Sequence, residues 1–346
     1  MISFESDYNN GMLPEILERL AKTNNEKTTG YGLDDYCGQA KGKIRQACGL
    51  EDADVFFLMG GTQTNATVID SLLSGCEGVI AAETAHINVH ESGAVEAFGH
   101  KVLALPAQDS KLSAEAIDRY MAAFLADETY PHMVQPGMVY ITFPTELGAL
   151  YTRQELEDIY AVCRKYDLYL FVDGARLGYG LMAGPNDMSL PFLASHCDVF
   201  YIGGTKVGAM FGEAVVYTNT RAPRHIFTMI KRHGALLAKG RMLGLQFDTL
   251  FTDDLYFRVA RHAIDKAEEL KQVFAHHGIE RAWNSPTNQQ FVVLTPAQKE
   301  QLMRSVAFEV WAPMADGRLV CRFVTSWATT QTDMQELDWA LAGLRS

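Results

Sequence analysis

The residue with the most specific chemistry in this sequence is Lys206, which follows an apolar run that ends in glycines. Residues 198–204 read Asp-Val-Phe-Tyr-Ile-Gly-Gly, and Thr205 separates the second glycine from the lysine. β-Branched and aromatic residues that end in glycines predict a buried strand and a tight turn. Partial burial favours the neutral amine, which attacks carbonyl groups. Lys206 is therefore our candidate to form a Schiff base with an aldehyde cofactor, although the same pattern occurs in ordinary exposed turns.

A glycine-rich turn at residues 60–65 is a candidate phosphate site. Residues 55–59 predict a short buried strand, and apolar residues at helical spacing begin at Val68. Gly61 and Thr62 therefore stand where a strand turns into a helix. Free backbone N–H groups and the positive end of the helix dipole attract a phosphate there, and Thr62 adds a hydroxyl donor. Glycines also occupy such turns for geometry alone, so both interpretations stay open.

Charged residues near strand ends are further candidates for the site. Asp173 follows the apolar run 168–172, which places a carboxylate at the C-terminal end of a predicted core strand, and Arg176 lies three residues beyond it. Arg322 interrupts another apolar strand, residues 319–324. A guanidinium in that position either has a structural partner or binds a ligand carboxylate through two hydrogen bonds.

Two histidines, His86 and His90, stand four residues apart. This spacing places two imidazoles on one helical face and is compatible with a metal site. The segment lacks the H-E-x-x-H order, and an imidazole lying over a planar ring explains His86 equally well. We therefore expect no metal, keep a zinc hydrolase as a distant alternative, and interpret His90 as an ordinary core or surface histidine.

The pattern of elements predicts an α/β fold. Predicted strands alternate with helices across residues 54–218, which implies a mostly parallel sheet with ligands at the strand ends. The chain then becomes helix-rich, with a long helix over 255–275, strands at 290–294, 306–311 and 319–324, and a terminal helix over 333–344. We expect a large domain at 1–245, which includes an N-terminal segment, and a smaller α+β domain at 246–346.

Composition limits the classes of partner. The chain has 346 residues, of which 48% are hydrophobic and 21% charged, and its formal net charge is −12. That is the composition of a soluble globular protein, and the negative charge with no basic stripe argues against nucleic-acid binding. No apolar run has the length of a membrane span, and the N-terminus lacks the features of a signal peptide. A cytoplasmic location and a small-molecule partner are therefore expected.

The candidate groups together are those that pyridoxal 5′-phosphate requires. Its aldehyde needs a lysine, its pyridine nitrogen needs a carboxylate, and its phosphate needs backbone donors. The chain resembles the fold-type I pyridoxal-phosphate enzymes over nearly its whole length, and within them the threonine aldolase and β-eliminating lyase family. The motifs that carry the resemblance are Gly-Gly-Thr-Gln-Thr-Asn at 60–65, Ala-Glu-Thr-Ala-His at 82–86, Val-Asp-Gly-Ala-Arg-Leu-Gly at 172–178 and Gly-Gly-Thr-Lys at 203–206.

The resemblance implies an aspartate-aminotransferase-like large domain and a role for each matching residue. Lys206 is the implied Schiff-base lysine, Asp173 the partner of the pyridinium, and His86 the residue stacked on the cofactor ring. The full implied set of cofactor ligands is Gly61, Thr62, His86, Asp173, Arg176, Thr205, Lys206 and Lys239, and the implied substrate ligands are Ser6, Arg176 and Arg322. The chain departs from the family in having Thr205 where serine is common and only His-Gly-Ala at 233–235 where a longer glycine run is common.

The resemblance also implies the reaction. We expect retro-aldol cleavage of L-threonine, L-allo-threonine or a related β-hydroxy-α-amino acid to glycine and an aldehyde. His86, or a water that it positions, is the expected base for the β-hydroxyl proton. The alternatives are a β-eliminating amino-acid lyase, a phenylserine-type aldolase, and a catalytically silent binding module with the same fold. A homodimer or homotetramer with shared active sites is expected, with Lys239 or Arg241 at a neighbouring subunit's phosphate.

Overall fold

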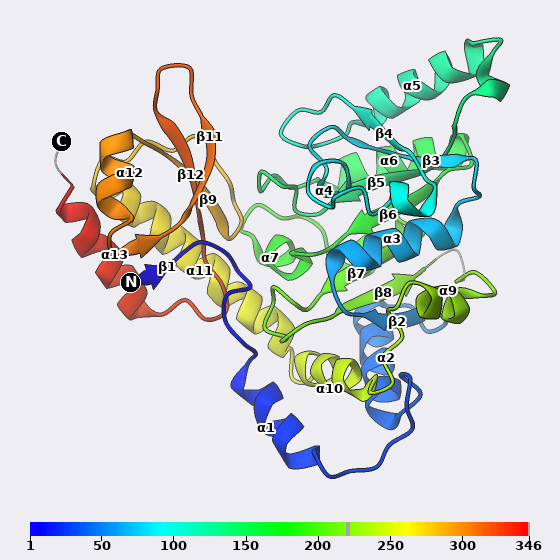
Figure 1. Ribbon diagram of the computed structural model, residues 1–346, viewed down its shortest axis with the longest axis horizontal. Coiled ribbons are helices and arrows are strands. Elements are labelled where there is room, and N and C mark those ends of the chain that lie inside the picture. The colour runs from blue at the N-terminus through cyan, green and yellow to red at the C-terminus, as the bar shows by residue number, and fades with distance from the viewer. Residues whose placement is uncertain (219–221, 345–346) are drawn as a thin grey trace.

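The computed structural model describes residues 1–218 and 222–344 (Figure 1). Most of the chain between residues 13 and 264 is built on one large apolar core, and a second, smaller core joins residues 2 and 4 to residues between 270 and 341. The two cores correspond to the large part at the right of Figure 1 and the small part at its left.

A seven-stranded sheet with strand order β2-β8-β7-β6-β5-β3-β4 forms the centre of the large part. The five strands β7, β6, β5, β3 and β4 are parallel, and β8 runs antiparallel to both of its neighbours. The strands are β2 (Asp54–Leu58), β3 (Glu77–Ala82), β4 (Val102–Leu105), β5 (Gln135–Thr142), β6 (Tyr169–Asp173), β7 (Val199–Gly203) and β8 (Glu213–Tyr217). The predicted mostly parallel α/β sheet is confirmed.

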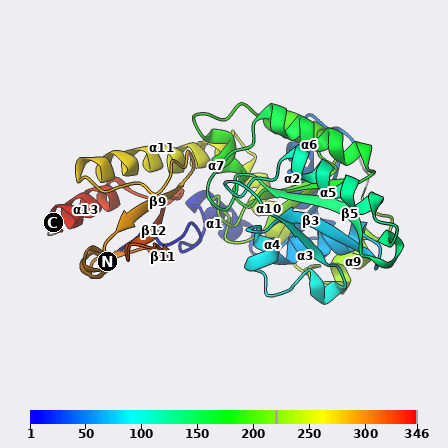
Figure 2. The ribbon, with the colours of Figure 1, turned by 90° about the horizontal axis from the view of Figure 1, so that it is seen from above.

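Helices cover both faces of this sheet. Figure 2 shows α5 and α6 on one face and α3 and α4 on the other. The helices of the large part are α1 (Pro14–Thr23), α2 (Asp35–Cys48), α3 (Gly61–Leu72), α4 (His86–Val89), α5 (Ala114–Ala126), α6 (Arg153–Lys165), α7 (Leu177–Met182), α8 (Leu190–Ser195), α9 (Ile226–Arg232) and α10 (Arg241–Leu250). Because both faces are covered, the central strands are mostly apolar, and every residue of β7 and β8 is buried, including Glu213.

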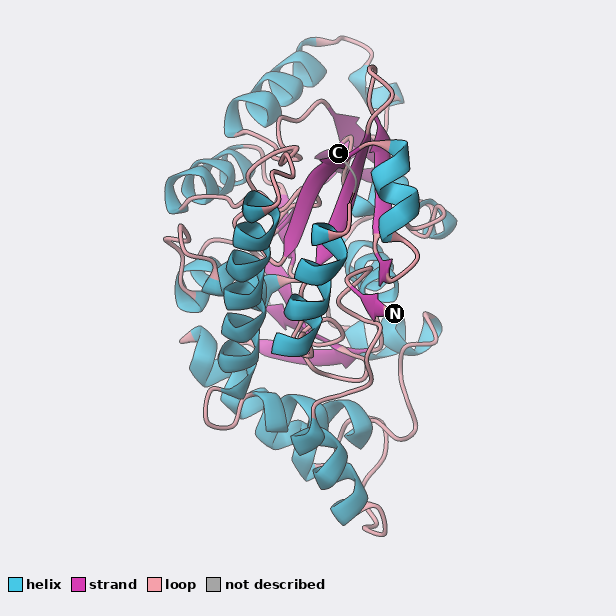
Figure 3. Ribbon diagram, turned by 90° about the vertical axis from the view of Figure 1, so that its left-hand side faces the viewer, coloured by secondary structure: helices cyan, strands magenta, loops and turns pink. Residues whose placement is uncertain are grey.

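The small part contains the antiparallel sheet β11-β12-β9, with strands β9 (Gln289–Leu294), β11 (Glu309–Pro313) and β12 (Leu319–Val324). Its helices are α11 (Leu255–His276), α12 (Pro296–Leu302) and α13 (Gln331–Ala342). The N-terminal strand β1 (Ile2–Ser3) pairs in parallel with β10 (Val306–Ala307), so the N-terminal segment joins α13 in this part (Figures 1 and 3). The predicted α+β unit is present.

One predicted strand was wrong in detail. We expected a single strand over 306–311, but the chain changes partner at Phe308, leaving β1 and joining β12. Phe308 is only 2% exposed and packs into the small core. The apolar sequence pattern is therefore continuous across the break between the two strands, and the pattern alone does not show the break. Among the described residues, no helix combines the length and apolar character needed to cross a lipid bilayer.

The division of the chain after residue 245 stays a prediction. That position lies within α10, and the apolar residues of α11 belong to the large core as far as Ile264 and to the small core from Leu270. The long helix α11 therefore links the two parts (Figure 1).

Candidate active site

The C-terminal ends of β6 and β7 meet the N-terminal ends of α3 and α4 at one cavity. Its empty space, counted together with the part open to solvent, is about 410 Å³, and its lining includes Gly61, His86, Asp173, Arg176, Tyr201 and Lys206. Residues more than 100 positions apart in the sequence thus meet at the sheet edge where ligands bind in α/β folds.

Lys206 lies in the turn after β7, as predicted. Burial, followed by the positive charge of Arg176, lowers the pKa of its amine from 10.5 to about 8. The backbone oxygen of Lys206 accepts a 2.5 Å hydrogen bond from the Tyr179 hydroxyl, which fixes the turn against α7. The side chain therefore has a substantial neutral fraction near neutral pH, and the neutral form is the nucleophile.

The turn that carries Lys206 is held by a buried carboxylate, Glu213. Its two oxygens accept hydrogen bonds from the Thr205 hydroxyl (2.8 Å) and the Gly204 backbone N–H (3.0 Å). Burial raises the pKa of Glu213 to about 8. Because the Thr205 hydroxyl is directed to Glu213, the structure shows it holding the turn, and its role as a cofactor ligand stays a prediction.

Asp173 stands at the end of β6 and accepts four hydrogen bonds. The donors are the hydroxyl groups of Tyr140 (2.5 Å) and Tyr201 (2.6 Å), the Asn65 amide (3.1 Å) and the Ala175 backbone N–H (2.9 Å). Burial raises the pKa of both tyrosines well above 10, and the negative charge of Asp173 raises it further. Both phenols therefore keep the protons that they donate. These donors stabilise the negative charge and fix the carboxylate at the cavity wall.

His86 begins the single-turn helix α4 and is fixed at two points. Its backbone N–H donates to Glu146 Oε1 (3.0 Å), and its Nδ1 lies 2.7 Å from Glu91 Oε1. A carboxylate at Nδ1 orients the imidazole and leaves Nε2 as the nitrogen available to the cavity. His90 is exposed, and its ring centroid lies 5.6 Å from that of His86. No group of three or more metal-ligating side chains occurs within residues 1–218 and 222–344.

The N-terminus of α3 carries the predicted phosphate turn. The first hydrogen bond within the helix runs from the Thr64 N–H to the Gly60 oxygen (2.9 Å), so the N–H groups of Gly61 and Thr62 have no acceptor inside the helix. No side chain caps this end. A Cβ at Gly61 would lie 3.2 Å from the Tyr201 hydroxyl, so glycine keeps the approach to the cavity open. The Thr62 side chain is exposed.

Arg176 lines the cavity but already has a partner. Its Nε and one terminal nitrogen bind the two oxygens of Asp7 at 2.7 and 3.1 Å. Asp7 is buried and also accepts from the Asn288 amide (2.9 Å). The sequence did not reveal this ion pair. The predicted role of Arg176 as a substrate ligand stays a prediction, because its guanidinium is already bound to Asp7.

Arg322 projects from β12 and has both partners and unused donors. It donates to Gln289 Oε1 (2.8 Å), pairs with Glu309, and lies over the Trp311 ring at 5.2 Å. Its Nε is buried and has no hydrogen-bond partner among the described residues. Burial, followed by the positive charge of Arg176, lowers the pKa of Arg322, which places the two guanidinium groups within electrostatic reach of each other.

Five predicted ligands are not among the residues that line the cavity: Ser6, Thr62, Thr205, Lys239 and Arg322. The Ser6 hydroxyl donates to Asn9 Oδ1 (2.6 Å), although Ser6 directly precedes Asp7 in the chain. Lys239 is exposed and lines a separate surface hollow beside Thr29. Arg241 donates to the Thr23 backbone oxygen and hydroxyl at 2.9 and 2.6 Å. Ser6, Lys239 and Arg241 therefore have other contacts or positions within one chain, and none of the three lines the cavity.

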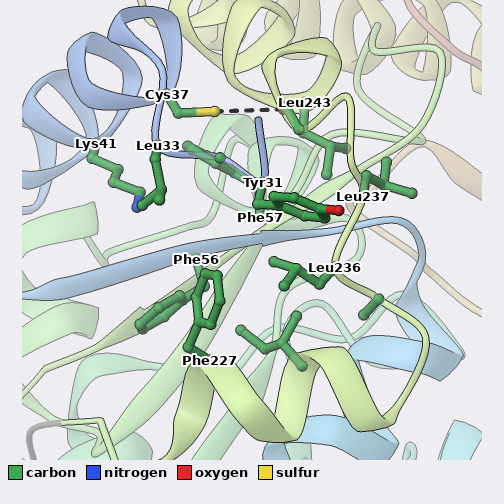
Figure 4. A pocket seen from close by; sticks show the side chains of 14 residues that line it. Tyr31, Leu33, Cys37, Lys41, Phe56, Phe57, Phe227, Leu236, Leu237 and Leu243 are labelled. Carbon is green, nitrogen blue, oxygen red and sulfur yellow. Dashed lines mark hydrogen bonds between the residues drawn. The ribbon is translucent and has the colours of Figure 1, made fainter. Parts of the chain in front are cut away.

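A second cavity is apolar and shares no lining residue with the first (Figure 4). Phe56 and Phe57 of β2 form one wall, and Phe227 of α9 forms another. The Cys37 thiol in it donates to the Gly240 oxygen at 3.5 Å, and burial raises its pKa to about 12. The cavity therefore offers no thiolate nucleophile, and the catalytic groups gather around Lys206.

Comparison with known proteins places this arrangement in a family. The family model for β-eliminating lyases matches residues 3–297. The chain belongs to this family. It is 32% identical to the low specificity L-threonine aldolase of Pseudomonas sp. and 31% identical to that of Pseudomonas aeruginosa, in each case over 96% of this chain and 95% of the relative.

Solved structures agree with the family assignment. A structure described as Leishmania major threonine aldolase superposes with a TM-score of 0.95 at 41% identity, and 99% of each chain is covered. Thermus thermophilus aspartate aminotransferase superposes with a TM-score of 0.70 at 16% identity, covering 99% of this chain and 91% of the other, which shows a shared fold. The aspartate-aminotransferase-like fold expected from the sequence is confirmed.

β-Eliminating lyases of this family depend on pyridoxal 5′-phosphate, and the residues present fit it. A partly buried amine with a lowered pKa matches the aldehyde, a buried carboxylate matches the pyridine nitrogen, and an uncapped helix N-terminus matches the phosphate. Lys206, Asp173 and Gly61 supply these three groups around one cavity.

Proposed function

We propose that this chain is a pyridoxal-phosphate-dependent aldolase that cleaves L-threonine, L-allo-threonine or a related β-hydroxy-α-amino acid to glycine and an aldehyde. The observation that carries the proposal is the joint presence, at one cavity, of Lys206 with its lowered pKa, the four-fold hydrogen-bonded Asp173, and a histidine fixed by a carboxylate. The threonine aldolase names of the relatives support the substrate class.

The residues of this chain divide the work of the reaction. When bound, pyridoxal phosphate supplies a carbonyl for an amine and a protonated ring that accepts an electron pair. Lys206 would hold the cofactor covalently, and Asp173 would keep the proton on the ring nitrogen. The N–H groups at Gly61 and Thr62 would bind the phosphate.

Substrate orientation is the role of Arg322. Its Nε lacks a protein partner among the described residues, and its ion partner Glu309 has a side chain 42% exposed, so a substrate carboxylate can replace that partner at modest cost. Arg176, bound to Asp7, adds positive charge beside this position. Holding the carboxylate would fix the orientation of the substrate and so determine which bond at Cα is cleaved.

His86 is the base. Glu91 holds Nδ1, so Nε2 accepts the proton of the β-hydroxyl as the Cα–Cβ bond breaks and the aldehyde leaves. The bound cofactor would accept the electron pair of that bond, and a proton added at Cα would complete glycine. A water positioned by His86 performs the same transfer if the hydroxyl lies too far from the ring.

The direct test is product analysis. The purified protein with pyridoxal phosphate should convert L-threonine to glycine and acetaldehyde, and the Lys206→Ala variant should not. Release of ammonia with a 2-oxoacid would instead make the protein a β-eliminating lyase, and turnover of phenylserine alone would make it a phenylserine-type aldolase. Cofactor binding with no turnover of any amino acid would leave a silent binding module. Zinc that stays bound to chelator-washed protein, measured by metal analysis, would support the zinc-hydrolase alternative.

We also propose a cytoplasmic homodimer or homotetramer with shared sites. The exposed position of Lys239, outside the cavity of its own chain, suits a contact with a neighbouring subunit's phosphate. Light scattering coupled to size-exclusion chromatography measures the subunit number. A monomer with full activity would rule out the shared site.

A further inference from the structure

A continuous hydrogen-bonded path of side chains joins the two sides of the active site. The Asn65 side-chain nitrogen donates to Glu91 Oε1 at 2.8 Å and to Asp173 Oδ2 at 3.1 Å. The same Glu91 oxygen lies 2.7 Å from His86 Nδ1. The path therefore runs from His86 through Glu91 and Asn65 to Asp173, and Asn65 is its central member.

We propose that Asn65 is a positioning residue for the whole site, because its amide donates to the carboxylate that orients the His86 imidazole and to the carboxylate that binds the cofactor's ring nitrogen. This inference rests on the function proposed above. It assigns Asn65 and Glu91 roles that the Lys206, Asp173 and His86 set does not include.

The surroundings determine which way the amide of Asn65 points. The NH₂ group lies near two carboxylates and, at 3.4 Å, the Tyr140 hydroxyl oxygen. Because ionised carboxylates only accept hydrogen bonds, the NH₂ group must face both of them. Within the described part of the chain, neither Glu91 nor Asp173 has an ion pair with an arginine or lysine within 4.0 Å, and the side-chain NH₂ of Asn65 is the only group bonded to both of these buried carboxylates.

The unused half of the amide points to the same role. Asn65 is fully buried, yet its Oδ1 has no hydrogen-bond partner among the described residues, and the same holds for Glu91 Oε2. An unpaired buried acceptor costs stability, so a residue chosen only for packing at this position would be apolar. The side chain is retained for its two N–H donors.

The orientation of the His86 ring depends on this path. Glu146 holds only the backbone N–H of His86, whereas Glu91 contacts the ring itself. Without Asn65, Glu91 keeps His86 as its only hydrogen-bonding side chain, and the pair is free to turn. Asp173 would still be held by its two tyrosines.

The experiment compares Asn65→Leu, which keeps the shape and removes the donors, with Thr67→Val on the same helix. Thr67 is also buried, but its hydroxyl bonds only the Gln63 backbone oxygen, so Thr67→Val is the control for disturbance of α3. Measured quantities are the dissociation constant of pyridoxal phosphate, the visible circular dichroism of the bound cofactor, kcat and KM for L-threonine, and the melting temperature.

Asn65→Leu should lower kcat about 10- to 100-fold and weaken cofactor binding about 10-fold, with a smaller change in KM, as is typical when the partner of a functional ligand is removed. The cofactor's circular dichroism should weaken because the ring is less firmly held. Thr67→Val should match the parent protein in all these quantities. A variant with parent values for both kcat and cofactor affinity would overturn the proposal, whatever its melting temperature.

A double-variant comparison tests the path itself. Glu91→Leu should lower kcat and leave cofactor binding nearly unchanged, and Glu91→Gln, whose carbonyl still accepts both hydrogen bonds, should restore most of kcat. The combination of Asn65→Leu and Glu91→Leu should lower kcat by less than the product of the two single losses, because both changes act through the same imidazole, although Asn65→Leu acts through Asp173 as well. Losses of kcat that multiply would show two independent effects and contradict the path.

Two of the measurements test the role of Asn65 independently of the proposed aldolase function. Cofactor affinity and circular dichroism are measured without substrate, so they test Asn65 even if L-threonine is not cleaved. If Asn65→Leu yields no folded protein, Asn65→Ser, which is too short to reach both carboxylates, is measured in the same way with the same expectation.

Discussion

Asp7 and Arg176 form a two-point ion pair across the active site, with Nε to Oδ2 at 2.7 Å and a terminal nitrogen to Oδ1 at 3.1 Å. Asp7 lies in the N-terminal segment, and Asn288, which precedes β9 in the small part, donates to it at 2.9 Å. Arg176 follows β6 in the large part. The pair therefore joins three regions of the chain at the cavity and sets the charge around Lys206.

Replacing Asp7 by asparagine should destabilise the protein by about 3–5 kcal/mol, because a buried guanidinium loses its counter-charge. Burial opposes ionisation of Asp7, but the positive charges of Arg176 and Lys206 hold its pKa below the ordinary 3.8. Its contribution is therefore present above about pH 4 and is lost as the pH falls through the lower folded-state pKa. Urea unfolding should show a difference between parent and variant at pH 7 that shrinks below pH 4. The exposed neighbour Glu5 provides the control, since Glu5→Gln should not change the free energy of unfolding either at pH 7 or below pH 4.

Replacing Arg322 by lysine should raise KM for L-threonine about 10- to 100-fold, because a charge-assisted two-point bond to the carboxylate is worth about 1.5–3 kcal/mol. The value of kcat should change less. Arg318→Lys is the matched control: Arg318 directly precedes β12, is paired with Asp316 and Glu280 outside the cavity, and should leave KM unchanged. Equal effects of the two changes on KM would remove Arg322 from the substrate site.

Replacing His86 by phenylalanine separates stacking from proton transfer. The ring is kept, so cofactor affinity should stay within about threefold, whereas kcat should fall about 10²- to 10⁴-fold with the loss of the base. His86→Ala should lower both the cofactor affinity and kcat. His90→Phe, at an exposed position, should retain activity. If the His86→Phe variant has the kcat of the parent protein, another group is the base.

The lowered pKa of Lys206 predicts how cofactor capture depends on pH. Only the neutral amine reacts, so the association rate of pyridoxal phosphate with the apoprotein should rise about tenfold per pH unit and level off above about 8. Asp7 raises this pKa through its negative charge, so Asp7→Asn should move the midpoint to lower pH. Stopped-flow absorbance measures both profiles, and a midpoint near the ordinary lysine value of 10.5 would contradict the account.

The local parts of the site were predictable because short patterns specify them. Asp173 is the last residue of one apolar strand and Lys206 lies three residues beyond the end of the next, and parallel strands bring their C-terminal ends to one edge of the sheet. Gly61 was predictable for a similar reason, since a glycine turn between a strand and a helix creates free N–H groups. These positions required no knowledge of distant contacts.

The partners of these residues were not predictable from short patterns. Asp7 and Arg176 lie 169 residues apart, and no periodicity connects them. Tyr140 and Tyr201 have the apolar spacing of ordinary strand residues, so only the structure shows that their hydroxyl groups meet at Asp173. For Asn65, the one available signal was a polar amide on the buried face of a helix that follows a phosphate turn.

The attachment site of the cofactor tests the central claim most directly. The protein is incubated with pyridoxal phosphate, reduced with borohydride, digested and mapped by peptide mass spectrometry, in parallel with the assay for glycine and acetaldehyde. The account predicts a pyridoxyl group on the peptide that contains Lys206, and loss of both label and activity in Lys206→Ala. A label on Lys239 or another lysine, or glycine formation by protein that carries no label, would contradict it.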